Sequence, residues 1–79
     1  MPLPPSVENQ LREFLGPLSN LENTLSGSRD RSVLDRFGPQ ADALHDQALA
    51  LLQQYYDTLD YDEYSRYSRM IQRARDGKY

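Results

Sequence analysis

The sequence predicts an all-α protein, a small up-and-down bundle of three helical segments with no β-sheet. Apolar residues recur at helical spacing along most of the chain. Residues that favour strands are rare, with two Val, one Ile and two Thr in 79 residues, and no long stretch alternates at period two. We expect an extended proline-rich lead over residues 1–5, one helical domain over 6–75 and a short tail over 76–79.

The longest regular stretch runs from Pro39 to Leu59. At about 100° per residue, its leucines and tyrosines, together with Ala41 and Ala48, fall within an arc of roughly 160°. Aspartates and glutamines fill the other side. Because an arc of this width cannot be covered by a single neighbouring helix, we expect this stretch to be the centre of the bundle.

The first helical segment is predicted over Ser6 to Leu25, with Ser6 as the N-cap. Its apolar residues are spaced by alternating steps of three and four. Gly16-Pro17 interrupts this segment, because a proline removes one backbone hydrogen bond and clashes with the preceding turn. The pair either kinks one helix or separates two short ones, and the unbroken apolar stripe favours the kink.

The second segment follows a loop over Ser26 to Arg31, in which Gly27 can end the helix in the left-handed conformation and Asp30 can cap the next one. A second Gly-Pro pair lies at Gly38-Pro39. Here we favour a short helix over 32–37 and a new helix that starts at Pro39, since proline suits the first helical position. If both pairs break their helices, the bundle has five short helices.

The last segment is predicted over Tyr61 to Arg75, with Asp60 as its cap and Gly77 as its end. A helix that runs from Pro39 straight through Asp60 is the alternative, since no glycine or proline lies at this joint. The residues that we expect in the core are Leu11, Phe14, Leu18, Leu21, Phe37, Leu44, Ala48, Leu51, Leu52, Tyr55 and Ile71.

Composition excludes several classes of function. The chain has no cysteine, so disulfides and thiolate metal sites are absent. The net charge is −3, which disfavours nucleic acid and anionic lipid as partners of the whole surface. The N-terminus lacks the pattern of a signal peptide and no window is apolar enough for a membrane span, so we expect a soluble, cytoplasmic protein with no membrane partner.

No motif predicts catalysis. His45 is the single histidine, and with Asp42 it offers two ligands at helical spacing, which is too few for a metal site. The four glycines form no phosphate-binding loop. We therefore expect a protein that is not an enzyme and that uses no cofactor or metal.

Tyrosine is the most unevenly distributed residue, because all six tyrosines lie within the last 25 residues. Such rings can fill a core, with their hydroxyls at its rim, or they can form a binding face, since tyrosine offers a large contact area with little loss of rotamer entropy. Three arginines fall within an arc of roughly 60° on the last segment. The residues that we expect to bind a partner are Tyr56, Tyr61, Tyr64, Tyr67, Arg66, Arg69 and Arg73.

These features predict a small protein–protein interaction module, a regulator, adaptor or inhibitor that self-associates as a homodimer or other homo-oligomer. Residues 61–79 carry five basic and three acidic groups, whereas residues 1–60 carry four and nine. One alternative is nucleic-acid binding, with the arginines on phosphates and the tyrosines stacked on bases. The other is a structural subunit that docks into a larger assembly.

Overall fold

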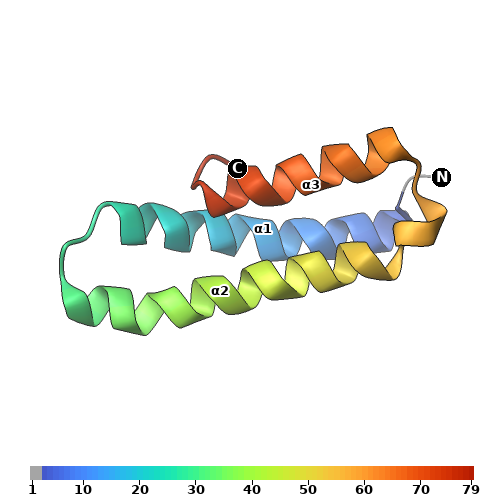
Figure 1. The fold of residues 1–79 in the computed structure, drawn as a ribbon. Helices are drawn as coiled ribbons and strands as arrows, with labels where there is room; N and C mark the ends of the chain where they lie inside the picture. The colour runs from blue at the N-terminus through green and yellow to red at the C-terminus, as the bar shows by residue number, and fades with distance from the viewer. Residues whose placement is uncertain (1–2) are drawn as a thin grey trace.

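The structure, a computed structural model, describes residues 3–79 and is all-α, as predicted. Its helices are α1 (Pro5–Ser26), α2 (Arg31–Gln54) and α3 (Tyr61–Arg75), with a short 3-10 helix, η1 (Tyr56–Thr58), before α3. They run up, down and up, and each packs on the other two to form a rod of 44 × 17 × 16 Å (Figure 1). Residues 3–79 contain no strand.

Both Gly-Pro pairs lie inside continuous helices. Pro17 is an internal residue of α1, which confirms the single helix favoured there, and Pro39 is an internal residue of α2, so the expected break at Gly38-Pro39 is wrong. Both prolines are exposed, and the carbonyls that they leave unpaired belong to exposed residues that water can reach. The long apolar seam on the opposite side of each helix offsets the lost hydrogen bond.

The N-terminal lead is anchored rather than mobile over its described part. Leu3 is 4% exposed and belongs to the hydrophobic core. Helix α1 starts at Pro5, with Pro4 as the N-cap, so the expected cap at Ser6 is wrong. Proline suits the first position because its missing N–H has no partner there in any case. Met1 and Pro2, the rest of the predicted lead, lie outside the described residues.

At the loop between α1 and α2, the start of α2 is capped as expected, but the end of α1 is not. Asp30 accepts hydrogen bonds from the Ser32 hydroxyl at 2.8 Å and the Ser32 N–H at 2.9 Å, and these two bonds lower the pKa of its carboxyl. Gly27 has φ −88° and is right-handed, contrary to expectation. Helix α1 therefore ends without the left-handed turn that its glycine allows.

The joint between α2 and α3 is a true break, so a single helix through Asp60 is wrong. Helix α2 ends at Gln54, five residues before the predicted end at Leu59. The Asp60 carboxylate accepts from the Glu63 N–H at 2.8 Å, and the Asp60 N–H donates to the Glu63 carboxylate at 3.2 Å. This reciprocal capping box fixes the start of α3 without help from glycine or proline.

The far end of α3 also follows its predicted boundary. Gly77 has φ +74°, the one positive φ among the described residues. The Lys78 N–H reaches back to the Arg73 carbonyl at 2.8 Å, and the Gly77 N–H to the Ala74 carbonyl at 3.0 Å. This pattern is a Schellman motif, in which the left-handed glycine satisfies carbonyls that the helix leaves open.

The core runs along the contacts between all three helices. The expected core residues that are buried are Leu11, Leu18, Ala48, Leu51, Leu52 and Ile71. Those that are only half-buried are Phe14, Leu21, Phe37, Leu44 and Tyr55. Leu15 was not expected and is 0% exposed. Since α1 packs on two helices, its buried face is wider than the single stripe that predicted it.

Candidate functional site

The residues expected to bind a partner divide between two faces of the molecule. Tyr56 lies in η1 and the other six lie on α3. Of the tyrosines, Tyr61 is 84% and Tyr56 60% exposed, whereas Tyr67 is 1% exposed. Tyr64 lies between these extremes and is half-buried. The tyrosine cluster is therefore neither wholly core nor wholly surface.

Tyr67 belongs to the core. With Ile71 and Ala74 it forms the buried face of α3. The Arg66 guanidinium lies over the Tyr67 ring, with its central carbon 5.2 Å from the ring centre. We therefore leave Tyr67 out of the candidate surface, because a partner has no access to its ring.

A groove marks the corner where η1 meets α3. The rings of Tyr56 and Tyr64 pack edge to face, with centroids 5.2 Å apart and planes at 85°. The groove beside them has a volume of about 480 Å³. Its lining residues are Tyr56, Asp57, Leu59, Asp60, Tyr61 and Tyr64. The lining thus combines three tyrosines with two aspartates.

A second groove continues from the first along α3, with a volume of about 580 Å³. Its lining residues are Tyr61, Tyr64, Ser65, Ser68, Arg69 and Gln72. Because Tyr61 and Tyr64 line both grooves, the two form one continuous surface. We call it the tyrosine–arginine surface, and it consists of Tyr56, Tyr61, Tyr64, Ser65, Ser68 and Arg69.

The three arginines expected on one face of α3 are all exposed. Arg69 lines the second groove, and Arg73 donates a hydrogen bond to the Lys78 carbonyl at 3.1 Å. Arg66 lies against the Tyr67 ring. Only Arg69 is thus part of the tyrosine–arginine surface, and the other two extend the positive charge beside it.

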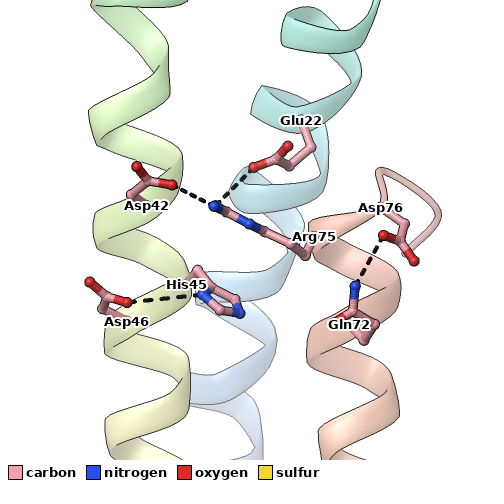
Figure 2. Close-up of polar contacts among 7 residues, drawn as sticks. All are labelled: Glu22, Asp42, His45, Asp46, Gln72, Arg75 and Asp76. Carbon is pink, nitrogen blue, oxygen red and sulfur yellow. Dashed lines mark hydrogen bonds and ion pairs between the residues drawn. The ribbon is translucent and has the colours of Figure 1, made fainter.

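A fourth arginine, Arg75, makes ion pairs that link α3 to both of the other helices. Its guanidinium binds the Glu22 carboxylate on α1 at 3.0 Å and the Asp42 carboxylate on α2 (Figure 2). The hydrogen bond with Asp42 raises the pKa of Arg75, and partial burial opposes that shift. The sequence analysis identified Arg75 only as the end of the last helical segment and did not predict these contacts.

His45 lies beside Asp46 on α2. Its Nδ1 lies 3.9 Å from an Asp46 carboxylate oxygen, and Asp42 is occupied by Arg75 (Figure 2). Within residues 3–79, no group of three or more His, Cys, Asp or Glu side chains is placed to hold a metal ion. None of the helices in this range has the length and apolarity to cross a membrane.

Sequence reasoning missed Ser65 and Ser68 as parts of the tyrosine–arginine surface, and it missed Leu59 as a lining residue of the first groove. Serines on an exposed helix face carry no signal alone. Their position in the sequence could have indicated them, because each serine follows a tyrosine by four residues and so lies beside it on the helix. Small side chains next to large rings leave a depression in the helix surface. The sequence matches no protein family model, no curated protein and no solved structure.

Proposed function

We propose that this protein is a small helical protein-binding module, a regulator, adaptor or inhibitor, that acts through the tyrosine–arginine surface. The observation that supports this most strongly is the exposure of Tyr61 and Tyr56, at 84% and 60%, beside a groove. Large aromatic rings in contact with water cost free energy unless another surface covers them. Tyrosine and arginine are also the residues most enriched where proteins bind each other tightly.

The shape of the surface supports a protein partner. Its two grooves follow α3 for most of the length of that helix, so they suit an elongated segment such as a helix or an extended peptide. The rings are partly fixed, since Tyr64 packs against Tyr56. Binding of a partner therefore costs little conformational entropy for the ordering of these two side chains.

Nucleic acid is the less favoured partner of this surface. Asp57 and Asp60 line the groove next to the exposed rings, and their carboxylates repel phosphates. Tyr67, one of the rings expected to stack on bases, is buried. The exposed rings that remain for stacking are therefore those nearest to the negative charges.

Photo-crosslinking tests the proposal directly. A benzoylphenylalanine in place of Tyr61, introduced into the full chain in its native host extract, should form an adduct with a protein. The same group in place of Gln47, an exposed residue of α2, serves as the matched control. Excess unlabelled protein should compete for the adduct, whereas an excess of the Tyr61→Ala, Arg69→Ala variant should not. Equal adducts at the two positions, or none at Tyr61, would reject the proposed surface.

A further inference from the structure

The tyrosine–arginine surface is complementary to itself in shape. Tyr61 lies at one end of this surface and is 84% exposed. Ser65 and Ser68 follow it on the same side of α3 and form the low floor of the second groove. A large side chain and a patch of small side chains on the same helix face allow two copies to pack together, because the large side chain of each copy fits over the small side chains of the other.

The same stretch is divided in charge along its length. Asp57, Asp60 and Asp62 are exposed at the start of α3. Arg66, Arg69 and Arg73 are exposed along the rest of it. If two copies lay parallel, like charges would face each other. If they lay antiparallel, the acidic end of each copy would face the basic end of the other, and the helix dipoles would also be opposed favourably.

We propose that the partner of this surface is a second copy of the chain, bound through an antiparallel pairing of the two α3 helices about a two-fold axis near Ser65 and Ser68. This inference rests on the proposed function and names its partner. Tyr61 of each copy lies over Ser68 and Gln72 of the other, and Asp62 faces the second copy's Arg69 and Arg73. The interface is isologous, so one surface patch supplies both sides.

Sedimentation equilibrium of the purified full chain tests the association itself. The wild type should be a monomer–dimer mixture whose dimer fraction grows with concentration and falls with salt. Tyr61→Ala should raise the dissociation constant about tenfold or more, because large aromatic rings that become buried on binding contribute much of the binding free energy of an interface. Gln47→Ala, on exposed α2, should leave it unchanged. A wild type that stays monomeric at high micromolar concentration overturns the proposal, and so does a dimer that Tyr61→Ala leaves intact.

Charge reversal tests the antiparallel orientation. Asp62→Arg alone should weaken the dimer, and so should the Arg69→Glu, Arg73→Glu pair. All three changes in one chain should restore it, because each reversed charge again faces its opposite. In a parallel dimer Asp62 would face Asp62 of the second copy. Asp62→Arg would then not weaken association, and the triple variant would not restore the affinity of the dimer. Circular dichroism checks that each variant keeps the helicity of the wild type.

Disulfide trapping locates the axis. The chain has no cysteine, so a single Ser68→Cys or Ser65→Cys variant carries one thiol only. Under mild oxidation one of these should crosslink to its own copy, since the Cα atoms near the axis come within the roughly 7 Å that a disulfide spans. Gln47→Cys should not crosslink faster than random collision. Crosslinking equal to that of the control at both serines overturns the two-fold arrangement.

The two proposals fail in different ways. A purified chain that is monomeric, but that forms an adduct with a foreign protein from position 61 in extract, overturns self-association and keeps the binding module. An adduct of twice the chain mass supports both. If the chain is monomeric and position 61 forms no adduct, both are overturned.

Discussion

The two faces of α3 use the same residue type for opposite purposes. Tyr61, Tyr64 and Tyr67 are each three residues apart, so each step turns by about 60° around the helix. Over that rotation exposure falls from 84% at Tyr61 to 1% at Tyr67. The inner face consists of Tyr67, Ile71 and Ala74 and is buried in the core, whereas the outer face carries Ser65 and Arg69. The angular position of a tyrosine, and not its presence in a cluster, determines whether its ring is buried in the core or exposed to solvent.

The largest expected effect of a single change is on the inner face. Tyr67→Ala removes a ring that is 1% exposed, and losses of about 3–5 kcal/mol follow when a buried aromatic is replaced by alanine. Such a loss is a large part of the stability of a small domain. Urea unfolding followed by circular dichroism should show a largely unfolded variant, or one with a much lower midpoint.

Tyr61→Ala is the matched control for this prediction. Its ring is 84% exposed, so the stability of the monomer, measured in dilute solution, should change by no more than about 0.5 kcal/mol. Equal losses in the two variants would contradict the division of α3 into a core face and a surface face.

An intermediate effect is expected at the start of α3. Asp60→Ala removes the carboxylate that caps the helix and should cost about 1 kcal/mol. For a domain of this size the melting temperature should fall by roughly 4–8 °C. Asp62→Ala removes the same charge two residues from the cap without removing either partner of the capping box, and serves as the control. If both variants melt alike, the charge and not the capping box stabilises this end.

The smallest expected effect concerns Arg75, which links the last turn of α3 to Glu22 on α1 and to Asp42 in the middle of α2. Its side chain is 33% exposed, so water screens its ion pairs, and Arg75→Ala should cost about 1 kcal/mol or less. The loss should shrink as salt is added, because salt screens the same attraction. Arg69→Ala, on the outer face, should leave thermal stability in dilute solution almost unchanged. A loss at Arg75 that does not depend on salt would point to packing of the side-chain stem instead.

The sequence predicted the helical class, the three segments and the bounds of α3, because periodicity and capping residues act locally. It did not predict that α2 continues through Gly38-Pro39. Proline disfavours a helix by a local cost, and the burial that offsets this cost comes from contacts along the rest of α2. For the same reason Leu15 was missed, since its neighbours lie on other helices.

The candidate surface was predicted less well than the fold. Sequence position brought Tyr56, Tyr61 and Tyr64 into consideration, and they do meet at one corner. It could not show that Tyr67 turns inward, because the direction of the core depends on where α1 and α2 pack. The sequence also did not indicate the contacts of Arg75, since its partners Glu22 and Asp42 are 53 and 33 residues away in the chain.

The unequal lengths of the helices have a consequence for local motion. Helix α3 has 15 residues and α2 has 24, so α3 ends before the loop that joins α1 to α2 (Figure 1). Near that loop Leu34 is 39% exposed, whereas Leu52 is fully buried. Amide protons around Leu34 should therefore exchange with deuterium much faster than those around Leu52, with a gradient of protection along the rod. The molecule would open from its two-helix tip inward, and the end that carries the tyrosine–arginine surface would be the last to loosen.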